Sequence, residues 1–222
     1  MTADGTPPAQ MMDDHVPPGA TYVYHWKVPE RAGPAENDPS SLVWLYHSHV
    51  DEVRDTNTGL VGAIVVSRAG QARPDGSPKD VDREVFSLFA IMDENLSLFI
   101  QDMRRRLRHP PHADDEGFEE SNLMHSINGY VMGNMPMPVM KVGERVRWYV
   151  LALGTETDLH TPHWHGNTVV VGGHRKDVVE LLPATTLVAD MKPDDPGIWM
   201  FHCHVNDHLT AGMTARYQVL PE

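Results

Sequence analysis

The chain has 222 residues, of which 41% are hydrophobic and 22% are charged, and its formal net charge is -13. A chain of this length and composition folds into one large domain or two small ones with a full core, and the negative charge argues against a nucleic-acid partner, because phosphate recognition needs a basic face. The single cysteine excludes an internal disulfide, and no apolar run approaches the roughly 18 residues that span a membrane.

The N-terminal third is expected to contain a flexible lead-in, three strands and a linker. Residues 1–20 are polar and rich in Pro and Gly, and they show neither the charged nor the apolar region of a signal peptide. Apolar residues mark strands over 21–28, 42–50 and 59–67. Chain breakers throughout 68–82 predict an interdomain linker.

The remaining chain is expected to form a second set of strands with one helix. Residues 83–95 open as a strand, and an amphipathic helix is predicted over 96–108, with Asn95 as its N-cap. Further short strands are predicted in "SINGYVM", "RVRWYVLAL", "NTVVVGG", "TTLVADM", "GIWMFHCHV" and "ARYQVLP". Short strands separated by turns every 8–12 residues or so are typical of an all-β sandwich or barrel.

A weak internal repeat relates the two parts of the chain. "WLYHSHVDEVRDTNTGLVGAIVV" aligns with "WMFHCHVNDHLTAGMTARYQV", and Ser48 stands in the first copy where Cys203 stands in the second. The two parts are therefore predicted to have related folds, and only the second carries sulfur ligands.

Three segments contain paired histidines. They are "HSH" with His47 and His49, "HTPHWH" with His163 and His165, and "HCHVNDH" with His202 and His204. Residues i and i+2 of a strand point to the same face, so each pair shares a face, and Cys203 points away from its two neighbours. The alternation predicts two metal sites back to back.

The cysteine is expected to hold a copper ion. A thiolate, two imidazoles and a weak axial thioether form the ligand set of a blue-copper electron-transfer site. Cys203, His208 and Met213 supply three of these ligands within a short segment, and His160 is the candidate for the fourth. The alternative without a metal is a cysteine buried as a small hydrophobic residue, and it does not explain the flanking histidines.

The paired histidines are expected to hold a multinuclear copper cluster. Three converging pairs would bring six imidazoles together, which is too many for one ion. A tetrahedral zinc site is the competing interpretation, but it leaves the cysteine site unexplained. The main chain joins Cys203 to His202 and His204, so an electron accepted at the cysteine site has a covalent route to the cluster. Such an arrangement suits the four-electron reduction of O₂ to water.

The motifs "HSH", "HTPHWHG", "HCHVNDHLTAGM" and "MHSINGYVMGNMP" together resemble the multicopper oxidases, in particular the two-domain, laccase-like and ceruloplasmin-like branch. The resemblance implies cupredoxin domains, which are Greek-key β-sandwiches: a partial domain 1 over 1–67, the linker 68–82, and a complete domain 2 over 83–222. It implies type 1 copper ligands His160, Cys203, His208 and Met213. It implies His163 as a type 2 ligand. Type 3 ligands would be His47, His49, His165, His202 and His204.

The chain departs from the family pattern in its N-terminal region. A further HxH motif is expected upstream of His47, but that region offers only His15 and His25, which do not form an HxH pair. The cluster would then have six of eight usual histidines, and domain 1 lacks its first half. A longer chain, or a partner that supplies the missing motif, would explain this departure.

The predicted function is that of a multicopper oxidase, which takes single electrons from a phenol, an aromatic amine or a metal ion and passes them to O₂. Asp207, next to His208, is the candidate proton donor, and Cys203 is the electron carrier. The alternatives are a nitrite-reductase-like cupredoxin and a blue-copper electron-transfer protein. By resemblance, we expect a homotrimer with the cluster at a subunit or domain interface, and a periplasmic or extracellular location; no membrane association is expected. The Met-rich stretch 132–140 is expected to serve packing more than Cu(I) entry.

Overall fold

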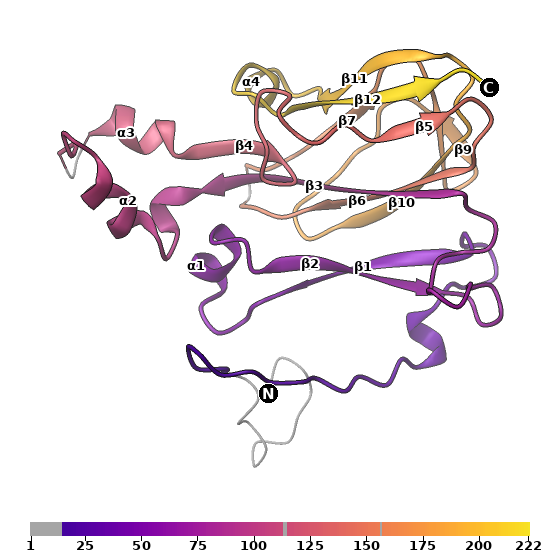
Figure 1. The fold of residues 1–222 in the computed structure, drawn as a ribbon, viewed down its shortest axis with the longest axis horizontal. Helices are drawn as coiled ribbons and strands as arrows, with labels where there is room; N and C mark the ends of the chain where they lie inside the picture. Colours follow the sequence, from indigo (N-terminus) through magenta and orange to yellow (C-terminus); the bar gives the residue numbers. More distant parts are fainter. Residues whose placement is uncertain (1–14, 113–114, 156) are drawn as a thin grey trace.

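The computed structural model describes residues 15–112, 115–155 and 157–222. The expected lead-in over 1–20 therefore lies mostly outside the described residues. Figure 1 shows three stacked layers of strands, with the earliest part of the chain on one side and the latest on the other. The mostly β architecture confirms the predicted all-β class.

The first layer is a β-hairpin made of β1 (Ser41–His47) and β2 (Val61–Ser67), which pair antiparallel. The middle layer is a sheet of six strands in the order β4 (Leu123–Ile127), β3 (Arg83–Asp93), β6 (Val146–Ala152), β10 (Thr186–Met191), β8 (Val169–Val171) and β9 (His174–Lys176). The third layer has the order β5 (Val139–Lys141), β12 (Thr214–Leu220), β11 (Gly197–Cys203) and β7 (Pro162–Trp164).

Short helices occupy the connections between the strands. They are η2 (Glu30–Ala32), α1 (Glu52–Asn57), η3 (Glu94–Leu96), α2 (Ile100–Arg106), α3 (Glu116–Ser121) and α4 (Asn206–Thr210). In Figure 1, α2 and α3 lie beyond the ends of β3 and β4, whereas α4 lies at one end of the third layer.

The main core fills the space between the middle and third layers. Its largest members are aromatic side chains, and Trp148 of β6 contacts Trp164, Phe201 and Tyr217 of the facing strands through ring–ring contacts. Aromatic rings bury large apolar areas and pack in tilted or edge-on pairs. This packing fixes β7 and β11, the strands that carry most of the candidate ligands.

A second, smaller core joins the hairpin to the opposite face of the middle sheet. Val43 of β1 packs with Tyr149 and Leu151 of β6. All seven residues of β6 are consequently buried, as is usual for a strand that is covered on both faces. The alternation sends Trp148 to the main core and Tyr149 to the hairpin.

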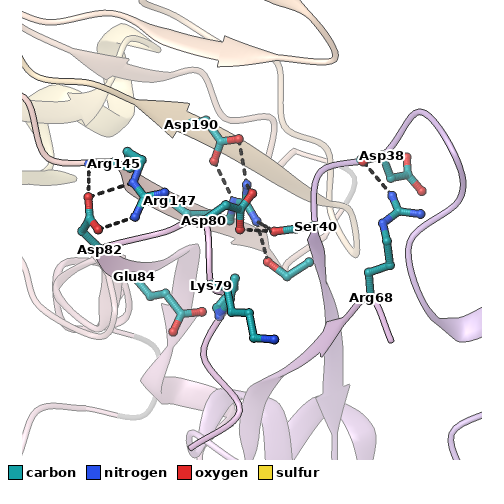
Figure 2. A network of polar contacts seen from close by, with 12 residues as sticks. Asp38, Ser40, Arg68, Lys79, Asp80, Asp82, Glu84, Arg145, Arg147 and Asp190 are labelled. Carbon is teal, nitrogen blue, oxygen red and sulfur yellow. Dashed lines mark hydrogen bonds and ion pairs between the residues drawn. The ribbon is translucent and has the colours of Figure 1, made fainter. Parts of the chain in front are cut away.

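A buried arginine connects the hairpin to the middle sheet. The Arg147 guanidinium donates to Asp190 and to the hydroxyls of Ser40 and Ser41, and it lies 3.7 Å from Asp80 (Figure 2). Its side chain is 3% exposed. Burying a charge costs free energy unless the charge is paired and hydrogen-bonded, and these partners meet that requirement. Asp80 belongs to the predicted linker 68–82, which therefore contacts the middle sheet; the domain division itself stays a prediction.

Three secondary-structure predictions were wrong. In "SINGYVM" only Ser126 and Ile127 lie in a strand, as the end of β4, and a turn follows at Asn128 and Gly129. Residues 21–28 form no strand, and Tyr22, Tyr24 and Trp26 are about half exposed or more, with their rings packed on one another. Alternation alone does not create a strand, because a strand also needs main-chain pairing with a neighbouring strand, and residues 21–28 are not part of a sheet. The helix predicted over 96–108 is limited to α2, and Asn95 bonds to Asp93 within the turn η3 and does not cap α2.

We predict that Arg147→Ala lowers the free energy of unfolding by about 2–3 kcal/mol, because it removes a buried cation and leaves its hydrogen-bond partners without their donor. Arg145→Ala is the matched control. Arg145 lies two residues away and pairs with Asp82, but its side chain is 52% exposed, so its loss should cost about 0–1 kcal/mol. Urea unfolding of the two variants measures the difference, and equal losses would contradict the prediction.

Candidate metal centres

The first candidate centre surrounds Cys203 inside the main core. The alternation of β11 buries Cys203 fully. His160 reaches it from the segment just before β7, and His208 reaches it from the short helix α4. The Sγ atom lies 4.0 Å from Nδ1 of His160 and 3.6 Å from Nδ1 of His208. The three ligand atoms lie within 4.8 Å of one another, and all three residues are buried. This geometry matches the grouping that the sequence predicted.

Main-chain hydrogen bonds place Met213 in the same region. The short helix α4 turns the chain back toward β11, so that the Cys203 N–H donates to the Met213 carbonyl at 3.1 Å and the Met213 N–H donates to the His208 carbonyl at 2.9 Å. Met213 is fully buried within the main core, which also contains Cys203. The Thr161 N–H donates to the Cys203 sulfur at 3.4 Å, a bond that the sequence did not indicate.

Burial keeps the two histidines of this centre neutral. It lowers the pKa of His160 to about 4, with a smaller effect from His208. It also lowers the pKa of His208, against the opposing charges of Asp158 and Asp207. Neutral imidazole is the form that binds metals. A thiolate, two imidazoles and a nearby thioether are soft to intermediate donors that suit copper, so the residues present fit a type 1 copper ion.

The second candidate centre lies on the outer face of the third layer. Ligand atoms of His163, His165 and His202 lie within 4.8 Å of one another. His202 Nε2 is 3.3 Å from His163 Nδ1 and 3.0 Å from His165 Nε2. The other ring nitrogen of His202 lies 2.6 Å from the Cys203 carbonyl; because a carbonyl only accepts, this nitrogen carries the proton and Nε2 presents a lone pair to the other rings.

The remaining features of this centre also favour a metal site. Burial lowers the pKa values of His163 and His202, and the neighbouring imidazoles lower them further. The His204 ring lies 5.3 Å from that of His163 and is exposed. Four imidazoles thus gather on one face, which fits a copper centre with open positions.

The third histidine pair does not join this cluster within the described part of the chain. His47 and His49 have ring centroids 6.1 Å apart and lie 3.8 and 3.6 Å from the Glu52 carboxylate. His47 ends β1 in the hairpin layer and His49 comes just after it, whereas the other four histidines lie on β7 and β11 of the third layer or directly after these strands. Figure 1 shows the middle layer between the hairpin and the third layer. The expectation that all six imidazoles converge is therefore corrected for a single chain, because both larger sheets separate them.

The structure brings a different carboxylate to the histidine cluster from the one predicted. Asp207 is exposed at the start of α4, and its charge acts on His208. The Asp177 carboxylate lies 3.8 Å from His163 Nε2. Its proximity follows from the pairing of residues 177–178 along β7, where the Trp164 N–H donates to the Asp177 carbonyl, and no sequence motif marked it. The proton-delivery role of Asp207 stays a prediction.

One further residue reaches the Cys203 centre from β4. His125 is mostly buried, and its ring centroid lies 5.3 Å from that of His208. Its Nδ1 lies 3.1 Å from the Leu123 carbonyl. His125 therefore lies beside a candidate ligand of the Cys203 centre.

Comparison with known proteins identifies related sequences and folds. The family model for multicopper oxidase matches residues 108–222. The chain is 44% identical to the mouse ferroxidase HEPHL1 and 42% identical to human hephaestin, in each case over 97% of this chain and 19% of the relative. It is 41% identical to human ceruloplasmin over 91% of this chain and 19% of that protein. The chain thus spans about a fifth of the length of these relatives.

Two solved structures have a similar fold. A copper nitrite reductase from Nitrosomonas europaea aligns with a TM-score of 0.58 over 85% of this chain and 63% of its own, at 19% identity. A multicopper oxidase aligns with a TM-score of 0.56 over 83% of this chain and 58% of its own, at 19% identity. These likenesses confirm the cupredoxin-like fold. Among the described residues, no helix has the length and apolarity to cross a membrane.

The lowered pKa of His160 predicts how stability of the copper-free protein depends on pH. The unfolded chain protonates this histidine near pH 6.5 and the folded chain only near pH 4, so unfolding takes up a proton between these values. His160 should therefore lower the stability progressively as the pH falls from 6.5 to 4, by about 3 kcal/mol at most. His160→Gln should flatten this part of the curve, measured by urea unfolding of metal-free protein, with the exposed His174→Gln as control. An unchanged slope in His160→Gln would contradict the assignment.

Proposed function

The chain belongs to the multicopper oxidase family, and from that premise we propose that it oxidises a metal ion such as Fe(II) one electron at a time and passes the electrons to O₂. The observation that carries the proposal is the pair of centres on the two faces of β11, one of which contains Cys203. Copper bound at these centres would supply the one-electron redox chemistry and the binding of O₂.

The residues assigned to each copper follow the two groups. We assign the type 1 copper to His160, Cys203, His208 and Met213. We assign the type 2 copper to His163, and the binuclear type 3 copper to His165, His202 and His204 together with a pair equivalent to His47 and His49 from outside this cluster. Cys203 holds the two groups in fixed relation, because peptide bonds join it directly to His202 and His204.

Charge and similarity favour a cationic reductant over a phenol. The net charge of -13 raises the local concentration of cations. Two carboxylates also act on the Cys203 centre, because the charges of Asp158 and Asp207 reach His208. HEPHL1, one of the similar proteins, is a ferroxidase by name. A laccase-like activity toward phenols is the less favoured form of the same proposal.

Two other properties stay predictions. Because His47 and His49 are separated from the other histidines, a complete cluster needs further histidine ligands from another surface. In a homotrimer, the His47 and His49 of a second copy would supply them. Light scattering of the native protein measures this directly, and a monomer with a full complement of copper would contradict the trimer. The periplasmic or extracellular location also stays a prediction.

Copper counting with absorption and EPR spectroscopy tests the proposed function. The wild-type protein should show one type 1 copper per chain and a coupled copper pair. Cys203→Ser should abolish the blue absorption and the oxidation of Fe(II) by O₂, because a hydroxyl is a poor copper ligand compared with a thiolate. In the wild-type protein, the ratio of Fe(II) oxidised to O₂ consumed reports whether O₂ is reduced fully to water. The exposed His174→Gln is the control. A single type 1 copper without oxidase activity would instead indicate a blue-copper electron carrier, the alternative that the separated histidines favour.

A further inference from the structure

We propose that Met132 is a positioning residue that holds Met213 against the copper at Cys203 and thereby sets the reduction potential of that copper. The inference rests on the proposed function, because Met213 has this role only if the Cys203 centre binds type 1 copper. Met132 belongs to the Met-rich stretch 132–140, which the proposed function does not use.

The main chain of this stretch is bonded to both neighbours of Met213. The Met132 N–H donates to the Gly212 carbonyl at 2.8 Å, and the Gly133 N–H donates to the Thr214 carbonyl at 3.0 Å. On its other side, Met213 is bonded to two of the predicted ligands, Cys203 and His208. The main chain around Met213 is therefore held from the outside by 132–133 and from the inside by the copper site.

The Met132 side chain also lies against this segment, at Gly212. A Cβ atom built on Gly212 would lie 2.8 Å from the Sδ and Cε atoms of Met132, and Gly212 has a φ of +109°. The positive φ favours glycine at position 212, and the end of the Met132 side chain occupies the space that a Cβ there would take. The Met132 side chain is 62% exposed, whereas Met213 is fully buried. Met132 forms the outer wall over Gly212, the residue that precedes Met213.

The backbone conformation of Met132 is unfavourable for a residue with a side chain. Its φ is +56°, a region that costs a residue with a Cβ about 1–2 kcal/mol and that glycine adopts freely. Such conformations persist where the surroundings impose them, and they cluster at functional sites. The adjacent Gly133, with a φ of +74°, shows the residue type usual in this conformation. A methionine at position 132 is therefore not explained by local propensity.

The axial ligand connects this clamp to redox chemistry. A thioether is a weak donor to type 1 copper, and the axial ligand tunes the reduction potential of such sites. Electron donation stabilises Cu(II) more than Cu(I), because the more highly charged ion gains more from a donor. A looser segment 212–214 would let the Met213 sulfur move away from the copper, and the reduction potential would rise.

A redox titration of the copper-loaded chain tests this inference. In Met132→Gly the clamp loses its side chain while the strained φ is relieved, and we expect the equilibrium between Cu(II) and Cu(I) to shift about tenfold toward Cu(I), which is about 59 mV for a one-electron couple. Met132→Ala also lacks the thioether but keeps a Cβ at positive φ, and it should shift in the same direction. Met132→Leu retains the bulk over Gly212 and should stay within about threefold of wild type.

The matched control separates the loss of the clamp from relief of strain. Ala184 also has a positive φ, +60°, and is exposed in the turn before β10, so Ala184→Gly relieves similar strain away from the copper site and should leave the potential and the type 1 spectrum unchanged. Shifts below threefold in both Met132→Gly and Met132→Ala, or an equal shift in Ala184→Gly, would overturn the inference. If Met132→Gly fails to load copper, Met132→Ala decides. A wild-type protein without type 1 copper would instead refute the proposed function.

Discussion

The strict alternation of β11 is the constraint on which the rest of the structure depends. It directs Phe201 and Cys203 into the main core and His202 and His204 to the outer face. A residue on a strand has only these two directions, so adjacent positions on one strand serve two different centres. A shift of the register by one residue would move the thiol to solvent and the imidazoles into an apolar core. The pairing of β11 with β12 and β7 excludes that shift.

Rigid packing behind β11 converts this alternation into a defined ligand geometry. The aromatic cluster around Trp148 and the fully buried strand β6 form a layer that cannot yield without creating cavities. On the other face of β6, Arg147 and its hydrogen-bond partners fix the hairpin and the preceding loop. The Cys203 centre thus lies against a wall supported on both sides, which suits electron transfer because such a site needs little rearrangement when the charge of the copper changes.

The sequence predicted well which side chains lie together locally, and it predicted the relation between layers poorly. Cys203, His208 and Met213 lie close together because only a few residues separate them, and His160 follows from the HxxHxH spacing. Alternation correctly placed His202 opposite Cys203. The position of His47 was beyond such reasoning, because periodicity states which face of a strand a residue occupies and not which sheet packs on that face. Asp177 was missed for the same reason. A bridge between residues that are distant in the chain leaves no pattern that can be recognised in the sequence alone.

The separation of His47 and His49 from the other four histidines determines how the histidine cluster could be completed. A cluster on the outer face of a sheet has one wall from that sheet, and its other wall must come from a surface that docks onto it. The unfilled side is accessible in this chain: His204 is exposed, and Met200 and Ile198, which share its face of β11, are 41% and 58% exposed. Apolar side chains beside imidazole ligands are suited to contact with another protein surface, where burial of their area would stabilise the association. Completion of the cluster would thereby depend on association of two surfaces, whereas the Cys203 centre is complete within one. The electron-accepting site and the O₂-reducing site would then differ in what they require: a folded chain for the first, and an assembled interface for the second.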